Sequence, residues 1–207
     1  MLASAALIAF YLPARKYWQD SFEKKPTDLR FYDIEVANIA GRPIAGGVIV
    51  PETTEPLPEL PTLEQEKLER EAFADEDIKI AIPRLKLDTF VYNGTEDAAL
   101  ARGPGLFDIS NIPGEGDRNV CIAAHRDIYA AEFLNIHTLT DGDFVYLTTK
   151  THRYTYQYEF TKIVHAYDWS TVDKVGYSCV TLQSCDPIGT TLNRIIVRAK
   201  LINIEEL

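Results

Sequence analysis

The chain has 207 residues, of which 46% are hydrophobic and 25% are charged, and its formal net charge is −10 at neutral pH. This length is enough for one hydrophobic core and an appendage, so we expect a single domain. Ten acidic and two basic residues lie between positions 51 and 77, and no basic stripe with interleaved aromatic residues occurs elsewhere, so no nucleic-acid partner is expected.

The first twelve residues are almost wholly apolar, but a membrane-spanning helix needs roughly 20 such residues. Three interpretations stay open: a truncated membrane anchor, the hydrophobic part of a signal peptide, and a helix that packs on the domain. We expect residues 1–50 to form a membrane-proximal segment with a truncated anchor. Four basic residues follow the apolar run: Arg15, Lys16, Lys24 and Lys25. They argue against the anchor interpretation, because basic residues beside a membrane span normally stay on the cytoplasmic side.

Residues 51–77 are predicted to form a linker and a short helix. Four prolines between Pro51 and Pro61 alternate with threonine and glutamate, a composition that favours extended chain. Thr62 and Gln65 have the spacing of a helix capping box, and acidic residues in the first turn favour a helix over about 63–73. The helix either docks on the domain or spaces it from the membrane, and its weak apolar stripe consists of Leu68, Ala72 and Phe73.

Strands dominate from Ile78 onward. Apolar residues alternate on both sides of Pro83, which predicts two short strands. Asn93-Gly94 predicts a turn, and a short helix is expected over 96–102, ended by Gly103-Pro104-Gly105. Further strands are expected at 119–124, 143–149, 153–166, 179–184 and 193–204, and the alternating tyrosines of 153–166 are typical of a barrel wall. Many short strands with brief helices predict a mainly β fold, a barrel or sandwich of about eight strands.

The segment 180–185, Val-Thr-Leu-Gln-Ser-Cys, is predicted to be a buried strand that carries a thiol at its end. The turn Asp186-Pro187-Ile188-Gly189 after it would expose the sulfur of Cys185, whereas Cys121 and Cys179 are predicted to be small buried residues. Three cysteines cannot all pair within one chain, so at least one thiol is free. Cys185 is therefore the candidate nucleophile.

A cysteine attacks as the thiolate and needs a base within hydrogen-bond reach, which is usually a histidine. His125 follows an apolar strand and is the candidate base, although its local sequence also allows a structural histidine at a strand end. Arg194, nine positions after Cys185 on the expected next strand, is the candidate donor to a developing oxyanion. Arg198 shares its face but lies roughly 13 Å further along the strand, too far for this role.

These residues resemble the motifs of the sortase family of cysteine transpeptidases. Sortases carry a Thr-Leu-x-Thr-Cys motif, an upstream Gly-His-Arg-like histidine, and an arginine followed by hydrophobic residues. The matches stand in the same order: Thr181-Leu182-Gln183-Ser184-Cys185, Ala124-His125-Arg126 and Arg194-Ile195-Ile196-Val197. Ser184 in place of threonine and Ala124 in place of glycine leave the subclass open. The resemblance covers about residues 78–207.

The resemblance implies a closed eight-stranded β-barrel with short helices over 78–207, on the outer face of the membrane and held there by an N-terminal anchor. It also implies cleavage of a Leu-Pro-x-Thr-Gly-like sorting signal through a thioacyl intermediate on Cys185, with His125 as general acid and base and Arg194 holding the substrate carbonyl. Ser184 and Leu182 are expected to line the substrate groove. The implied partners are surface proteins with a C-terminal sorting signal and an amine of a peptidoglycan precursor or a pilin lysine.

Three other functions stay open on the sequence alone. A cysteine peptidase or amidase with the same Cys-His pair would release its product to water. A zinc module of Cys121, His125, Cys179 and Cys185 lacks the short loops that structural zinc sites have. A catalytically inactive adhesion barrel is the third. No cofactor is expected, although some sortases bind calcium, and the carboxylates available for it are Glu96, Asp97, Glu115 and Asp117.

Overall fold

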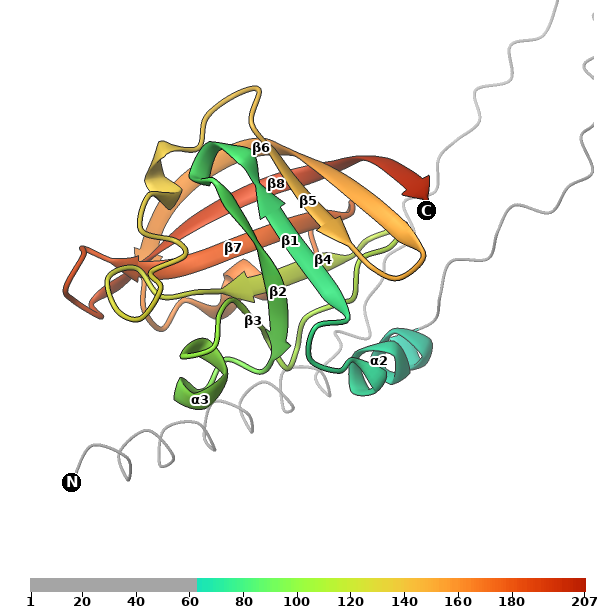
Figure 1. The fold of residues 1–207 in the computed structure, drawn as a ribbon, viewed down its shortest axis with the longest axis horizontal. Helices are drawn as coiled ribbons and strands as arrows, with labels where there is room; N and C mark the ends of the chain where they lie inside the picture. The colour runs from blue at the N-terminus through green and yellow to red at the C-terminus, as the bar shows by residue number, and fades with distance from the viewer. Residues whose placement is uncertain (1–62) are drawn as a thin grey trace, which may run out of the picture. The chain divides into compact units, whose positions relative to one another are not determined.

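The computed structural model describes residues 63–207 and shows eight strands closed into a barrel (Figure 1). The strands are β1 (Ile78–Ile82), β2 (Leu87–Asn93), β3 (Gly105–Leu106), β4 (Asn119–Ala123), β5 (Phe144–Thr148), β6 (His152–His165), β7 (Cys179–Asp186) and β8 (Asn193–Glu206). The helical elements of this part of the chain are short: α2 (Leu63–Ala72), α3 (Asp97–Leu100) and the 3-10 turns η1 (Pro83–Leu85), η2 (Ile136–Thr138) and η3 (Trp169–Val172). The predicted mainly β, closed eight-stranded barrel is confirmed.

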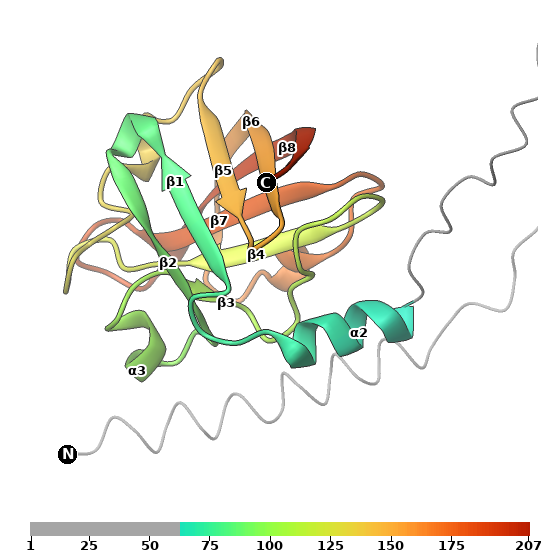
Figure 2. The ribbon, with the colours of Figure 1, turned by 45° about the vertical axis from the view of Figure 1, so that its right-hand side comes forward.

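The order of strands around the barrel is β1-β2-β3-β4-β7-β8-β6-β5, and the ring closes because β1 pairs with both β2 and β5. The pairs β2 with β3 and β4 with β7 are parallel, and the others are antiparallel. Figure 2 shows β4 and β7 side by side. Their pairing brings together segments that are far apart in the sequence, from Asn119 opposite Cys179 to Ala123 opposite Gln183.

Alternate side chains of each strand fill the barrel, because successive residues of a strand point to opposite faces. Val120 and Ile122 of β4, Leu182 of β7 and Val197 of β8 are fully buried in the main core. Tyr156 of β6 is buried with them, which agrees with the predicted tyrosine wall. A second, smaller cluster covers the outer face of the sheet at β4 and consists of Phe107, Cys121, Ala123 and Val172.

Strand β3 has only two residues and was not predicted. Its first residue is Gly105, which pairs with Tyr92. A Cβ atom at Gly105 would collide with the carbonyl oxygen of Gly94, so the close approach of these two backbones requires glycine. Glycine and proline at 103–105 predict the end of a helix. This local pattern gives no indication that Gly105 and Leu106 form a strand.

Helix α2 agrees with the predicted position, but the predicted apolar stripe is wrong. Leu68 is 60% exposed, and the helix instead buries the polar residues Glu66 and Arg70. Of the three residues of that stripe, Phe73, which directly follows the helix, is buried in the main core. The docking face of α2 is thus held by hydrogen bonds and ion pairs.

The predicted anchor segment 1–50 and the part of the linker up to residue 62 lie outside the described residues. In residues 63–207, no helix has both the length and the apolar character needed to cross a membrane.

Candidate active site

Three neighbouring strands place the predicted reactive residues on one face of the sheet. The parallel register of β4 and β7 ends with Ala123 opposite Gln183, and the N–H of Ala124 donates to the carbonyl of Gln183 at 3.2 Å. His125 lies two positions beyond Ala123, the last paired residue of β4, and Cys185 lies two positions beyond its partner Gln183. On the other side of β7, Cys185 is directly opposite Arg194 of β8. Directly opposite residues of antiparallel strands have their Cβ atoms about 5 Å apart, so the side chains of Cys185 and Arg194 are neighbours.

This face is the outer one. The inward residues of β7 and β8, such as Leu182 and Ile195, belong to the main core, and Cys185 and Arg194 alternate with them. His125 continues the outward positions of Cys121 and Ala123 on β4. All three predicted residues are partly exposed, so a substrate can reach them from outside the barrel.

The three cysteines differ in the way the sequence predicts. Cys121 and Cys179 are buried, and all three thiols are free. Burial raises the pKa of the Cys121 thiol above its usual range and raises the pKa of the Cys179 thiol to about 11. Both therefore stay protonated at neutral pH and are poor nucleophiles. Cys185 is the partly exposed thiol at the end of β7.

The imidazole of His125 lies two positions after the end of β4. Its Nε2 atom is shielded from solvent and makes no hydrogen bond within residues 63–207. The ring lies beside that of Tyr129, with 5.1 Å between ring centroids, and the carbonyl of His125 accepts a hydrogen bond from the N–H of Phe133. The loop after β4 thus fixes the backbone of His125 through the bond from Phe133.

The two arginines of β8 have different surroundings. Arg194 is partly exposed, and its Nη1 donates to the carbonyl oxygens of Thr191 at 3.0 Å and Asn193 at 2.9 Å. Arg198 is buried opposite Thr181 and donates to the Thr181 hydroxyl and the carbonyl of Thr171. The predicted register of β8 is confirmed, because Arg194 faces Cys185 and Arg198 lies four residues further along.

The structure does not bring Leu182 and Ser184 to this face. Leu182 is fully buried in the main core, and Ser184 is 3% exposed and donates its hydroxyl hydrogen to the carbonyl of Ala124. Both residues are an odd number of positions from Cys185 and therefore point to the other side of the sheet. The groove-lining role predicted for them does not agree with these positions. Leu182 packs β7 onto the main core, and the hydrogen bond of Ser184 joins β7 to the end of β4.

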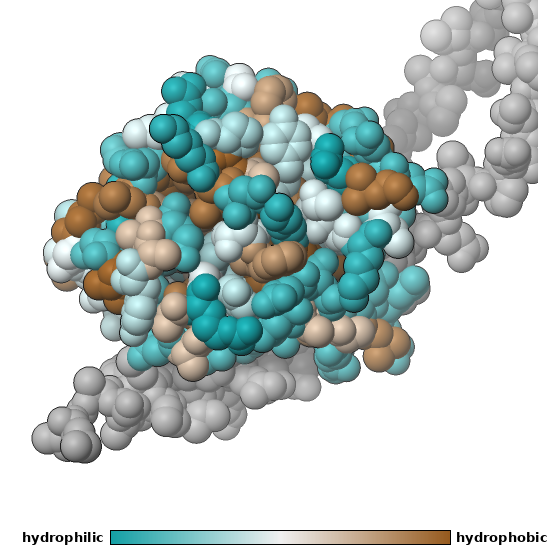
Figure 3. All heavy atoms as spheres, in the orientation of Figure 1, coloured by the Kyte–Doolittle hydropathy of each residue, from teal (hydrophilic) through white to brown (hydrophobic). Residues whose placement is uncertain are grey.

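Sequence reasoning missed a group of apolar residues around the candidate site. They are between 40% and 74% exposed and come from the loops after β4, after β6 and between β7 and β8: Ile128, Tyr129, Tyr167, Trp169, Ile188 and Leu192. Figure 3 shows apolar surface gathered at the left-hand end of the described domain, where Figure 1 places the loop between β7 and β8. The sequence did contain one indication of this apolar surface, because Ile188 and Leu192 stand in an otherwise polar turn.

The residues considered for metals do not converge. Within residues 63–207, no group of three or more His, Cys, Asp and Glu side chains lies close enough to hold a metal ion. Of the carboxylates considered for calcium, Asp117 accepts hydrogen bonds from the N–H groups of Val175 and Gly176, so it has a structural role.

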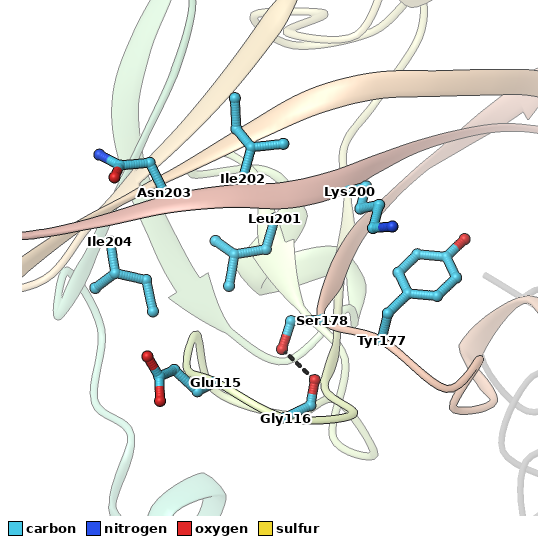
Figure 4. Close-up of a pocket in the computed structure, with 9 residues that line it drawn as sticks. All are labelled: Glu115, Gly116, Tyr177, Ser178, Lys200, Leu201, Ile202, Asn203 and Ile204. Atoms are coloured by element: carbon cyan, nitrogen blue, oxygen red, sulfur yellow. Dashed lines mark hydrogen bonds between the residues drawn. The ribbon is translucent and has the colours of Figure 1, made fainter. Parts of the chain in front are cut away.

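A shallow cavity of about 420 Å³ lies away from Cys185 (Figure 4). It forms where β8 extends beyond β7, and the hydroxyl of Ser178 closes one side by donating to the carbonyl of Gly116 at 2.7 Å. No residue of the candidate active site lines it: the lining consists of Glu115, Gly116, Tyr177, Ser178, Lys200, Leu201, Ile202, Asn203 and Ile204.

Comparison with known proteins gives a consistent result. A model of the sortase domain matches residues 80–202. Sortase A of Listeria monocytogenes is 29% identical over 130 residues, which are 62% of this chain and 57% of that protein. The solved structure of Listeria monocytogenes sortase A has a TM-score of 0.58 at 27% identity, covering 63% of this chain and 90% of that chain.

Sortases of other classes are similar to the same extent. The pilus-related sortase C of Group B Streptococcus has a TM-score of 0.60 at 25% identity, covering 63% of this chain and 69% of that chain. A mutant of sortase E from Streptomyces avermitilis has a TM-score of 0.58 at 25% identity, covering 65% of this chain and 93% of that chain. These similarities do not select one subclass. The sortase model matches more than half of the sequence, and the chain therefore belongs to the sortase family.

Proposed function

We propose that this chain is a cysteine transpeptidase that cleaves a Leu-Pro-x-Thr-Gly-like sorting signal and transfers the cleaved protein to an amine. The observation that carries the proposal is that Cys185 is paired directly with Arg194, with His125 two positions beyond the end of the parallel pairing between β4 and β7. Membership of the sortase family supports the general role in transpeptidation.

In the first step, the thiolate of Cys185 attacks the carbonyl carbon of the threonine and forms a carbon–sulfur bond. Arg194 donates a hydrogen bond to the carbonyl oxygen while that oxygen carries negative charge. The imidazolium of His125 gives its proton to the leaving nitrogen of the glycine. The carbon–nitrogen bond breaks, and a thioester on Cys185 remains.

In the second step, the acceptor amine attacks the thioester carbonyl, and neutral His125 takes the proton that the amine loses. The carbon–sulfur bond breaks, which gives a new amide and restores the thiolate and the imidazolium. Arg194 can serve both steps because a guanidinium has five N–H donors, and the described contacts with the loop carbonyls of Thr191 and Asn193 use Nη1 alone.

The exposed apolar residues around the site support a peptide substrate with leucine and proline. The loop after β6 is joined to the loop between β7 and β8 by a hydrogen bond from the N–H of Ala166 to the carbonyl of Leu192 at 3.2 Å. Tyr167, Trp169, Ile188 and Leu192 from these loops offer apolar contacts for such a peptide. These residues, rather than Leu182 and Ser184, are the proposed walls of the groove.

The proposed partners follow from this chemistry. The donor is a surface protein with a C-terminal sorting signal, and the acceptor is an amine of a peptidoglycan precursor or a pilin lysine. The similarity to a pilus-related sortase C supports keeping a pilin among the candidates. The proposed location is the cell membrane with the barrel on the outer side, and residues 1–50 are the proposed anchor.

The test is a cleavage assay on the full chain with a peptide that contains Leu-Pro-x-Thr-Gly. Mass spectrometry should detect a thioacyl adduct on Cys185, and added amine should convert the adduct to an amide. Cys185→Ala should form neither product, whereas Cys179→Ala should keep both. If added amine does not compete with water for the adduct, the chain is a peptidase or amidase and not a transpeptidase.

A further inference from the structure

A buried arginine joins the end of β4 to the proposed nucleophile. Arg126 directly follows His125, and its side chain is only 4% exposed. Its Nη1 donates to the carbonyl oxygen of Cys185 at 3.0 Å, and its Nε donates to the carbonyl oxygen of Leu134 at 2.9 Å. One side chain therefore bonds both to the strand that carries the thiol and to the returning part of the loop that follows His125.

Two further contacts complete the surroundings of this guanidinium. Nη1 lies 3.4 Å from Oδ1 of Asp186, and Nη2 donates to Nδ1 of His137 at 3.1 Å. A buried charge needs such partners, because an unpaired one costs several kcal/mol. None of these hydrogen bonds, within the described residues, reaches the sulfur of Cys185. Arg126 thus holds the backbone around the reacting atoms without touching them.

The hydrogen bond to Cys185 takes the place of a missing rung in the sheet. In the parallel ladder, the N–H of Ala124 donates to the carbonyl of Gln183, and the next rung would join residue 126 to the carbonyl of Cys185. Strand β4 has ended at Ala123, and the side chain of Arg126 donates to that carbonyl. The bond joins the backbone of Cys185 to the residue that directly follows His125.

We propose that Arg126 is a positioning residue that sets the separation between the thiolate of Cys185 and the imidazole of His125. The inference rests on the proposed transpeptidase function, in which both proton transfers depend on that separation. The rigid fork of the guanidinium bonds to the strand and to the loop at the same time. A lysine ammonium at this position keeps the charge but cannot reach both carbonyls with the same geometry.

The experiment compares Arg126→Lys with Arg118→Lys in the full chain. Arg118 is a matched control because it is also buried, directly precedes β4 and donates to a backbone carbonyl, that of Ile112, at 3.1 Å. Arg126→Lys should lower kcat for amide formation about 100-fold with KM nearly unchanged, since a 1 Å misplacement can cost about this much. Arg118→Lys should lower the melting temperature and leave kcat within about twofold of the wild type.

A second measurement needs no substrate. In the wild type, blocking Cys185 with a methanethiosulfonate reagent should move the NMR resonances of the His125 imidazole, because the proposed mechanism needs the two side chains within reach of each other. In Arg126→Lys this response should fall to less than half, and in Arg118→Lys it should stay the same. The positioning role is overturned if Arg126→Lys loses no more kcat than Arg118→Lys, or if its NMR response equals that of the wild type. If the wild type cleaves no peptide, the proposed function fails, and the NMR response alone decides the role of Arg126.

Discussion

At the scale of single residues, burial separates the three thiols, and this leads to a labelling prediction. Iodoacetamide at about neutral pH should modify Cys185 in the folded chain, because only the thiolate reacts and burial raises the pKa of the Cys121 and Cys179 thiols. In denaturant all three cysteines should react. Mass spectrometry of peptides measures both. Modification of Cys179 in the folded chain as fast as that of Cys185 would contradict the assignment.

The two arginines of β8 should give opposite phenotypes. Arg194→Ala should lower kcat by about 10²–10³ without changing the melting temperature, because it removes an oxyanion donor from a partly exposed position. Arg198→Ala should lower the free energy of unfolding by about 1–3 kcal/mol, because it leaves the buried Thr171 carbonyl without this donor. Steady-state kinetics and thermal unfolding measure the two effects. A loss of kcat in Arg198→Ala with unchanged stability would mean that the roles are reversed.

At the scale of elements, the docking of α2 depends on polar contacts. Arg70 donates to the carbonyls of Phe107 at 2.9 Å and Leu106 at 3.3 Å, and Glu66 binds Lys174 at 2.7 Å. Helix α2 therefore joins the segment after β3 to the loop before β7. This explains why an apolar stripe predicted the contact face poorly.

The corresponding prediction is that Arg70→Ala lowers the free energy of unfolding by about 1–3 kcal/mol, because two backbone carbonyls lose a buried donor. Lys67→Ala is the control, since its exposed ion pair with Glu71 is worth no more than about 0.5 kcal/mol. Chemical denaturation measures both. Equal effects of the two substitutions would show that α2 is not held by Arg70.

At the scale of the whole molecule, aspartates bind segments from different parts of the barrel. Hydrogen bonds from the N–H of Asn93 and from Arg102 lower the pKa of Asp75, and those from Lys150 and the N–H of Ala74 lower the pKa of Asp77. The Arg84 guanidinium lowers the pKa of Asp143. A carboxyl with a lowered pKa in the folded state stabilises the fold above its ordinary pKa of 3.8. This contribution is lost as the pH falls through the lowered value.

We therefore expect the melting temperature to fall with decreasing pH below about 4. Asp143→Asn keeps the shape of the side chain and removes its charge, so it should be less stable than the wild type at neutral pH. The difference should vanish well below pH 3.8, where the wild-type carboxyl is also protonated. Thermal unfolding across pH measures this, and an equal difference at neutral and acid pH would contradict the role of the Asp143 charge.

The sequence alone was enough for every strand except β3, because side-chain alternation and turn residues are local signals. The likeness to sortases rested on three short motifs. Alternation also places Cys185 and Arg194 near adjacent strand ends. Alternation also argues against the groove-lining role predicted for Leu182 and Ser184. Both lie an odd number of positions from Cys185 and must point to the other face of the sheet.

The tertiary structure decided what depends on contacts between distant segments. Only the parallel register of β4 and β7 brings the segment that leads into His125 alongside the strand that carries Cys185, and a one-residue slip would turn either side chain to the core. The bond from Arg126 to the Cys185 carbonyl and the polar docking of α2 likewise join residues far apart in the chain. No local pattern encodes such pairs, because their free energy comes from partners that meet only after the barrel has closed.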